Sequence, residues 1–290
     1  MSEEQDDVVE EIPKEQKFED GWLDPELPKG YLSPSQVSMY RMCSMQYMYA
    51  YILQLRKPPG IAQLRGTAVH KGVEATHLHT IAHGIPMSMD EGASTVSDKF
   101  DAKASEIESW EEESQGDAKD KAIRMFKVYY REAVPHIHPV RVEHNFKWSR
   151  DLCGVPVLGV IDLVDSVLDP DLGLENDPEN PNRIEVVSDL KTVKSFWSES
   201  RVHNSAQLTF YAIAENTNRV RIDFIAAQKT GTKYKSVSST RSRQDKMIVL
   251  EDVTSIAYQI KQGNFYRCSP DGWNCAPLYC GYYAKCRGKK

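Results

Sequence analysis

The sequence predicts an α/β fold with a small mixed central sheet flanked by helices and with a helical N-terminal lobe. Apolar residues recur at helical spacing through much of the first half of the chain, and they alternate with polar residues from Val140 onward. The expected order is helices, an antiparallel hairpin, and then strand, helix and strand, which is typical of the α/β class. With 290 residues, of which 40% are hydrophobic, the chain is long enough to bury a core.

Helices dominate the residues before the sheet. Ser33 and Gln36 form a capping-box pattern and Pro34 suits a first turn, so a helix is expected from here toward Leu53. Three further helices are expected, over 65–79, 96–114 and 118–133. Residues 29–139 therefore form the helical lobe. Residues 1–28 are acidic and lack an apolar period, so they are expected to form a disordered or loosely docked arm.

Four strands are expected after this lobe, over 140–148, 155–168, 184–192 and 220–228. A turn at 151–154 joins the first pair, and a long polar loop at 169–183 leads to the third strand. Two more helices are expected, over 197–216 and 252–262. The core domain is thus 140–264, and residues 265–290 form a cysteine-rich tail.

The charge is unevenly distributed along the chain. The first 28 residues hold eleven acids and two lysines, so the rest is net basic although the whole chain carries −6. From Lys29 to Val73 there are six bases and no acid, which is expected of a surface that meets phosphates, although a solvated face shows the same pattern. No apolar run approaches the roughly 20 residues that cross a bilayer, and the acidic opening is unlike a signal peptide. We therefore expect a cytoplasmic protein without a membrane partner.

A group of chemically suggestive side chains falls on the expected elements. Asp189 and Lys191 are two residues apart on a strand, so their side chains project from the same face. Asp162 lies inside an otherwise apolar strand, where a carboxylate is costly unless a cation meets it, and a divalent metal would do so. His70 follows Gly66 by one helical turn and could supply a further ligand. Each of these features alone also occurs in ordinary structural roles.

Four motifs occur in order along the chain: Gly66-x-x-x-His70, Gly159-x-Ile161-Asp162, Asp189-x-Lys191 and Gln207-x-x-x-Tyr211. This series resembles that of the RecB-like branch of the PD-(D/E)XK nuclease superfamily, over roughly Tyr31 to the C-terminus. The resemblance implies a restriction-endonuclease-like core and a metal-dependent DNA exonuclease, active in DNA recombination, repair or replication. Its substrate would be DNA that is single-stranded or has free ends.

The same resemblance assigns roles to individual residues. The groups expected to hold Mg²⁺ or Mn²⁺ are His70, Asp162, Asp189 and the carbonyl of Leu190. Lys191 would orient or help activate the attacking water, and Gln207 and Tyr211 would support the site or a DNA strand. Glu143, on the preceding strand, is a conceivable additional ligand, but its place on a half-buried strand favours a solvent-facing residue.

Six cysteines in a reducing compartment are more often thiols or metal ligands than disulfides. The four that resemble the iron-sulfur staple of AddB-type and CRISPR-associated RecB-like nucleases are Cys43, Cys275, Cys280 and Cys286. That resemblance implies a structural [4Fe-4S] cluster. Four residues separate Cys275 from Cys280, where two are commoner, which leaves zinc open and leaves Cys268 as a substitute for Cys275. Cys153 is expected to be an ordinary residue.

Two other functions stay open. One is a catalytically minor DNA-binding accessory protein with a structural metal cluster, and the other is a structural zinc protein without a nucleic-acid role. The intact set of His70, Asp162, Asp189 and Lys191 argues against the first, and the buried carboxylate of Asp162 argues against the second. No G-x-x-x-x-G-K-[ST] motif occurs, so a helicase or recombination partner would be a separate protein.

Overall fold

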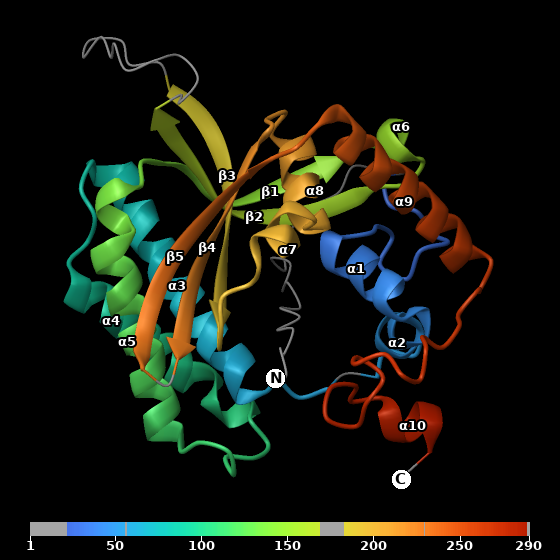
Figure 1. Ribbon diagram of the computed structural model, residues 1–290, viewed down its shortest axis with the longest axis horizontal. Coiled ribbons are helices and arrows are strands. Elements are labelled where there is room, and N and C mark those ends of the chain that lie inside the picture. The colour runs from blue at the N-terminus through green and yellow to red at the C-terminus, as the bar shows by residue number, and fades with distance from the viewer. Residues whose placement is uncertain (1–21, 56, 169–182, 229, 289–290) are drawn as a thin grey trace. The chain divides into compact units, whose positions relative to one another are not determined.

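A computed structural model describes residues 22–55, 57–168, 183–228 and 230–288 (Figure 1). The chain divides into two compact units. The first unit comprises Pro58–Asn145 and Val160–Ser242, and the second comprises the described residues up to Lys57, Phe146–Gly159 and the residues from Arg243 onward. The polar loop expected at 169–183 lies almost wholly outside the described residues, as does most of the acidic arm.

A five-stranded sheet forms the centre of the fold, in the order β1-β2-β3-β4-β5. The strands are β1 (Pro139–Trp148), β2 (Val157–Leu168), β3 (Arg183–Val193), β4 (Arg219–Gln228) and β5 (Gly231–Thr240). β2 pairs with β3 and β4 with β5 in antiparallel fashion, whereas β3 and β4 are parallel, with Asp189 opposite Ile222. The mixed sheet predicted from the sequence is confirmed, with four strands near their expected bounds.

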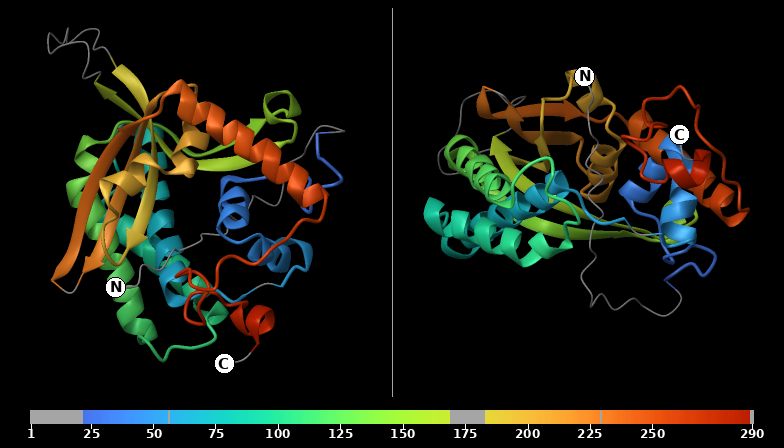
Figure 2. Two further views of the ribbon diagram at one scale, coloured as in Figure 1. Left: turned by 45° about the vertical axis from the view of Figure 1, so that its right-hand side comes forward. Right: turned by 90° about the horizontal axis from the view of Figure 1, so that it is seen from below.

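Helices cover both faces of this sheet in the first unit (Figure 2). One face carries α3 (Ile61–His83), α4 (Met89–Lys103) and α5 (Gln115–Glu132), and the other carries α7 (Glu199–His203) and α8 (Ala206–Ala214). A buried core joins Val69 of α3 and Phe126 of α5 to Leu190 of β3 and Ile225 of β4. Phe224, which directly precedes Ile225 on β4, packs instead against Trp197 because successive strand residues face opposite sides.

Local capping explains why the lobe helices differ from their expected bounds. Ser88 and Glu91 form a reciprocal capping box, so α4 begins at Met89 rather than at residue 96. Ser114 caps α5, and Gly84 ends α3 in the left-handed conformation that glycine adopts without strain. Among the described residues, no helix has the length and apolar character needed to cross a bilayer.

The second unit is assembled from the two ends of the chain and the tip of the first hairpin. It contains α1 (Pro34–Met42), α2 (Ser44–Tyr47), a π-helical turn (Met48–Ile52), α6 (Arg150–Cys153), α9 (Arg243–Lys261) and α10 (Tyr283–Arg287). The Tyr40 hydroxyl donates to the Asn264 carbonyl at 2.5 Å, and the Ser44 hydroxyl donates to the Tyr266 carbonyl at 3.0 Å. These bonds hold the first helices against the segment that follows α9.

Several expected elements were wrong in detail. The single helix expected from Ser33 to Leu53 is interrupted at Cys43, whose backbone is extended at φ −164°. The turn expected at 151–154 contains the short helix α6, and the helix expected over 197–216 is divided into α7 and α8. β5 was not predicted at all because its sequence, GTKYKSVSST, is short of apolar residues.

Candidate active site

Strands β2 and β3 separate at the point where the predicted acidic residues lie. Their antiparallel ladder ends at Leu163 opposite Ser188, and the next residues in that register are Asp162 and Asp189. The Leu190 N–H donates to Asp162 Oδ2 at 2.8 Å. If the ladder continued, this N–H would bond to a backbone carbonyl of β2, so the Asp162 side chain takes the place of that carbonyl. The two carboxylates therefore face each other across a fork in the sheet.

Asp189 and Lys191 form an ion pair beside this fork. Lys191 Nζ lies 3.1 Å from Asp189 Oδ2, and Asp189 is only 1% exposed. The prediction that these side chains project from one face is therefore confirmed. Asp189 Oδ2 is buried, and within the described part of the chain its contact with Lys191 is an ion pair without normal hydrogen-bond geometry. A carboxylate oxygen can accept more than one partner, so a metal ion could bind here beside Lys191.

His70 reaches the fork from helix α3. A Cβ atom at Gly66 would lie 2.9 Å from Thr192 Oγ1, so glycine at this position lets α3 approach β3 closely. One turn later, His70 Nδ1 lies 3.6 Å from Asp162 Oδ2, and the His70 ring also hydrogen-bonds the Leu190 backbone. The structure thus brings His70, Asp162 and Leu190 together, as the sequence predicted.

Glu143 joins the group, although the sequence favoured a solvent-facing position for it. Its carboxylate lies with ligand atoms of His70 and Asp162, all within 4.8 Å of one another. Glu143 has φ +46°, a conformation that non-glycine residues rarely adopt inside a strand. Val142 and Glu143 therefore line the same pocket although they are neighbours on β1. Alternation in the sequence could not reveal this, because a local backbone conformation breaks it.

The protonation states follow from burial and from Lys191. Burial raises the pKa of Asp162, and it raises that of Asp189 to about 6, while the Lys191 ammonium opposes both shifts. Burial, aided by Lys191, lowers the pKa of His70 to about 4. Near neutral pH the imidazole is therefore uncharged, with a lone pair available for a metal. A divalent cation fits this donor set.

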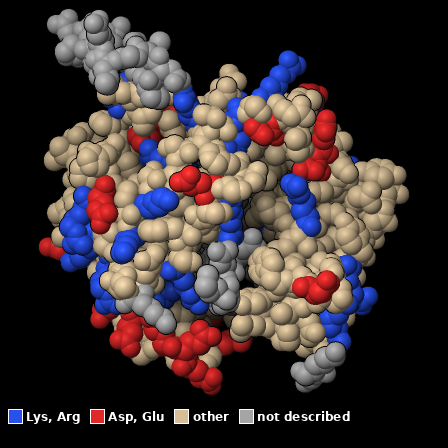
Figure 3. Space-filling view, in the orientation of Figure 1, with Lys and Arg blue, Asp and Glu red and all other residues tan. Residues whose placement is uncertain are grey.

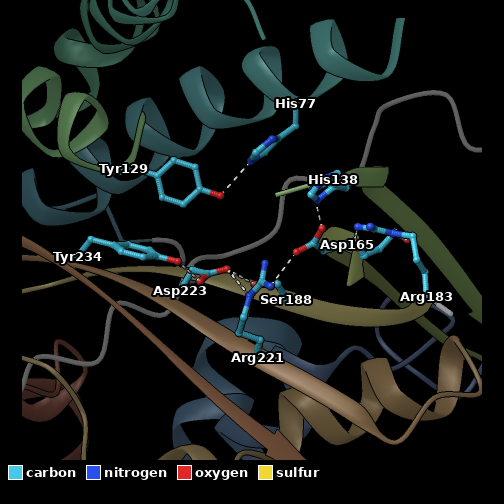
Figure 4. A network of polar contacts seen from close by, with 10 residues as sticks. His77, Tyr129, His138, Asp165, Arg183, Ser188, Arg221, Asp223 and Tyr234 are labelled. Atoms are coloured by element: carbon cyan, nitrogen blue, oxygen red, sulfur yellow. Dashed lines mark hydrogen bonds and ion pairs between the residues drawn. The ribbon is translucent and has the colours of Figure 1, made fainter. Parts of the chain in front are cut away.

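A buried polar network lies next to the fork (Figure 4). Arg221 of β4 donates to Asp165 at 2.7 Å and to Asp223 at 2.9 Å, and Asp223 also accepts from Ser188 at 2.5 Å and from Tyr234 at 2.6 Å. Burial alone would raise the pKa of Asp223, but Arg221 and the two hydroxyl donors lower it below its ordinary value. The network therefore joins four adjacent strands through hydrogen-bonded carboxylates.

The network anchors the residues of the fork. Asp165 follows Asp162 by three residues on β2, and Ser188 directly precedes Asp189 on β3. Ser188 and Asp223 also line the pocket that holds the His70, Glu143 and Asp162 group. Their fixed contacts limit how far the ends of β2 and β3 can shift beside the site.

Gln207 and Tyr211 lie on α8, which packs on β3 and β4. Gln207 Nε2 donates to the Tyr211 hydroxyl at 2.7 Å. Tyr211 is fully buried. The expected role of this pair in supporting the site or a DNA strand stays a prediction.

The basic stretch from Lys29 to Val73 is partly neutralised. Arg65 is 7% exposed and pairs with Glu113 at 2.7 Å, and Lys71 pairs with Glu74 at 2.8 Å. Both acids lie outside the acid-free stretch of residues 29–73, and Glu74 lies one helical turn from Lys71. The stretch is therefore weaker support for a phosphate-binding surface than its composition suggested.

A second group of chemically reactive side chains lies in the second unit. Five thiols line one pocket there, those of Cys43, Cys268, Cys275, Cys280 and Cys286. Cys43 lies at the break between α1 and α2, whereas the other four belong to the C-terminal tail. The sixth, Cys153, is buried elsewhere and hydrogen-bonds the Val155 carbonyl at 3.4 Å. The four cysteines predicted to share a site are thus brought together, with Cys268 beside them.

The chain is similar in sequence to one protein family and in fold to solved structures. The family model described as the PD-(D/E)XK nuclease superfamily matches residues 31–287. The chain belongs to this superfamily. The crystal structure of a "putative exonuclease" from Eubacterium rectale is similar in fold, with a TM-score of 0.56 and 14% identity over 95% of each chain. The structure of SSO0001 has a TM-score of 0.32 and 14% identity over 52% of this chain and 61% of that one. Comparison with curated proteins gives no match.

Membership in the superfamily makes the chain a nuclease with a restriction-endonuclease-like α/β fold. Nucleases of this superfamily generally use divalent metals, and the fork between β2 and β3 offers the group of side chains that could hold one. The superfamily match spans both the fork and the tail cysteines up to Cys286.

Proposed function

We propose that this nuclease is a Mg²⁺- or Mn²⁺-dependent DNA exonuclease of the RecB-like branch, with its active site at the fork between β2 and β3. The observation that carries the proposal is the meeting of Asp162, Asp189 and His70 at the fork, with Lys191 3.1 Å from the buried Asp189 oxygen. Two carboxylates held in low-dielectric surroundings are costly, and this arrangement is expected where a cation is bound in function.

The residues that would hold the metal are His70, Glu143, Asp162, Asp189 and the Leu190 carbonyl. Glu143 is added to the set expected from the sequence because its carboxylate lies with those of the group. A bound divalent ion supplies a more acidic water and neutralises charge that develops on the phosphate during hydrolysis. The buried Asp189 Oδ2 and the raised pKa of both aspartates are consistent with such a ligand set.

The protein's own contribution is to place charge and hydrogen-bond donors around the reacting phosphate. The Lys191 ammonium, fixed by Asp189, can orient a water molecule or donate to a phosphate oxygen. The buried network through Arg221 holds both strands in place while this occurs. His70 stays neutral near pH 7 and so does not repel the cation.

DNA as the substrate follows from the superfamily and from the charge on the surface. Figure 3 shows Lys and Arg side chains gathered over the part of the molecule where β5 lies. Lys233 and Lys235 are exposed on this edge strand. Exposed lysines on an edge attract phosphates and also discourage pairing with another strand. The exonuclease assignment is in keeping with a structural neighbour of similar fold that is described as a "putative exonuclease". A role in recombination, repair or replication is part of the same proposal.

We further propose that the thiol pocket holds a structural [4Fe-4S] cluster. A [4Fe-4S] cluster takes four thiolate ligands, and the five cysteines that line this pocket can supply them. A tetrahedral zinc ion with four thiolates is the alternative that the same residues allow. The cluster would connect Cys43 to the tail and so stabilise a fold built from distant segments.

The test of the nuclease proposal uses the purified full chain with labelled linear and circular single-stranded DNA. Linear DNA should be digested with Mg²⁺ or Mn²⁺ and should remain intact with a chelator, whereas circular DNA should persist because it has no end. Lys191→Ala should lower the rate by roughly a hundredfold or more, since it removes a group positioned at the reacting phosphate.

Lys119→Ala is the matched control, because it removes an ammonium group that pairs with Asp101 on the lobe surface. It should leave the rate unchanged. Equal digestion by wild type and Lys191→Ala would show that the fork is not the active site. Digestion of circular DNA would make the enzyme an endonuclease.

A further inference from the structure

Large apolar side chains of the C-terminal tail lie at the surface of the second unit. Among the described residues, three side chains of Phe, Tyr or Trp are more than half exposed, and two of them, Tyr266 (63%) and Trp273 (53%), belong to the tail. Leu278, in the same segment, is 74% exposed. A ring as large as that of tryptophan gains much from being covered, so such a group of exposed side chains is expected where a partner binds.

Hydrogen bonds hold the turn that carries Trp273. The Gly272 N–H donates to the Ser269 carbonyl at 3.2 Å. Asn274, the residue after Trp273, donates from Nδ2 to the Met42 carbonyl at 3.2 Å and so ties this turn to the end of α1. The Trp273 side chain is therefore presented to solvent from a backbone that is fixed on both sides of it.

Trp273 and Tyr279 form one aromatic surface. Their ring centroids lie 5.9 Å apart with the ring planes at 75°, which is the edge-to-face arrangement that aromatic pairs favour. The Tyr279 N–H donates to the Ala276 carbonyl at 3.1 Å, so this ring also belongs to a hydrogen-bonded turn. The pair covers part of the Trp273 ring and leaves more than half of the side chain open to a flat partner.

The tail around this surface is basic. Residues 265–290 hold five bases and one acid, Asp271, which accepts a hydrogen bond from Ser269. Arg267 and Lys285 are exposed, and no carboxylate in the described part of the chain forms an ion pair with either of them. Their positive charge can therefore attract an anionic partner.

Open aromatic rings together with positive charge fit single-stranded DNA. The bases of a single strand have flat faces that stack on aromatic side chains, whereas a duplex hides those faces between neighbouring base pairs. Exposed arginine and lysine attract the phosphates. A protein partner fits this surface less well, because lysine is depleted in protein interfaces and the tail carries three lysines.

We propose that Trp273 stacks on a base of single-stranded DNA, with Tyr279 supporting its ring and with Arg267 and Lys285 attracting the phosphates. This inference rests on the proposed nuclease function and deepens it, because it assigns a single-stranded substrate and a contact for that strand outside the fork. Every base has a flat face, so this contact binds DNA without regard to its sequence.

The experiment measures binding of the full chain to two labelled oligonucleotides of equal length by fluorescence anisotropy, without added divalent metal. One strand is oligothymidylate, and the other carries abasic sites, so it keeps the phosphates and lacks the bases. The wild type should bind the thymidine strand roughly tenfold more tightly than the abasic strand. Trp273→Ala should lose this preference and should bind the abasic strand as the wild type does, which also shows that the variant is folded.

Two further variants make the test specific for the Trp273 ring. Trp273→Phe keeps an aromatic ring and should retain a preference for the thymidine strand. Tyr258→Ala removes the third exposed aromatic side chain, which lies on α9, and should show the wild-type preference. Equal binding of both strands by the wild type, or an unchanged preference in Trp273→Ala, would overturn the inference. Equal loss of both strands by Trp273→Ala would do so too, because an abasic strand has no base to stack.

Two other measurements separate this inference from its alternatives. Sedimentation of the wild type and Trp273→Ala tests for a second copy of the chain on this surface, and a wild-type dimer that the variant lacks would overturn the inference. Digestion of DNA by the wild type, lost in Lys191→Ala, tests the fork by itself. Intact digestion without a preference for bases overturns this inference alone, whereas a wild type that digests no DNA overturns the proposed nuclease function.

Discussion

Acid sensitivity of the fold should depend on His77. This residue lies on α3, is 1% exposed, and its Nε2 atom lies 2.9 Å from the Tyr129 hydroxyl (Figure 4). Burial lowers the pKa of His77 to about 4, from an ordinary value near 6.5. The unfolded chain therefore takes up a proton between these values while the folded chain does not. Stability is full above about pH 6.5 and falls as the pH drops toward about 4.

The size of this effect follows from the shift. A difference of about 2.5 pKa units corresponds to about 3 kcal/mol in the free energy of unfolding once the pH is below both values. At about pH 5 some 2 kcal/mol of this should already be lost relative to about pH 7.5. Asp189 acts in the opposite direction, because its raised pKa of about 6 lets the folded chain bind a proton first on acidification. Only a comparison with a variant isolates His77.

The assay is urea unfolding of wild type and His77→Gln with a chelator present, at about pH 7.5 and about pH 5. Between the two pH values, the free energy of unfolding should fall by about 2 kcal/mol more in the wild type than in His77→Gln. His83→Gln removes an exposed histidine from the same helix and should behave as the wild type does. If His77→Gln shows the wild-type dependence on pH, the argument from burial is refuted.

Three further predictions concern packing, metal and DNA. Gly72→Ala should lower the free energy of unfolding by about 1–3 kcal/mol, because the added Cβ would lie 2.4 Å from Val96 Cγ2. Thermal unfolding measures this loss, and Gly116→Ala, at an exposed position, is the control. Glu143→Gln should raise the Mn²⁺ concentration for half-maximal digestion roughly tenfold or more without changing stability, and an unchanged value would remove Glu143 from the ligand set. Affinity for single-stranded DNA should fall steeply between about 50 and 200 mM salt, and a flat dependence would exclude phosphate contacts as its main source.

The sequence predicted the regular parts of the fold because their periodicity is complete. β2 is largely apolar, and β3 and β4 alternate apolar with polar residues over part of their length, so their strand assignment did not depend on contacts elsewhere. β5 was not predicted because its sequence is rich in lysine, serine and threonine and lacks an apolar face. The strand forms by pairing with β4, and the sequence of β5 alone does not show that β4 lies beside it.

The part of the candidate site that lies on regular strands could be predicted from residue type and order along the chain. Asp162, Asp189 and Lys191 lie on strands that were recognised, and the fork brings the two aspartates opposite each other. Glu143 lies with His70 and Asp162 although the sequence favoured a solvent-facing position, and its positive φ departs from the regular strand geometry on which that expectation rested. No pattern of residue types indicates such a conformation at a glutamate, since the strain is stabilised by surroundings that come from other parts of the chain.

Both proposed metal sites lie where regular structure is interrupted. At the fork, the ladder between β2 and β3 stops, and the Leu190 N–H that it releases is taken up by Asp162. At Cys43, an extended residue separates α1 from α2, so its sulfur lies beside the tail instead of along a helix face. An interruption exposes backbone groups and turns side chains out of the regular packing, which costs stability in the absence of a ligand. A cation at the fork and a cluster at the thiols would each offset that cost, so removing the metal should destabilise the unit that contains it.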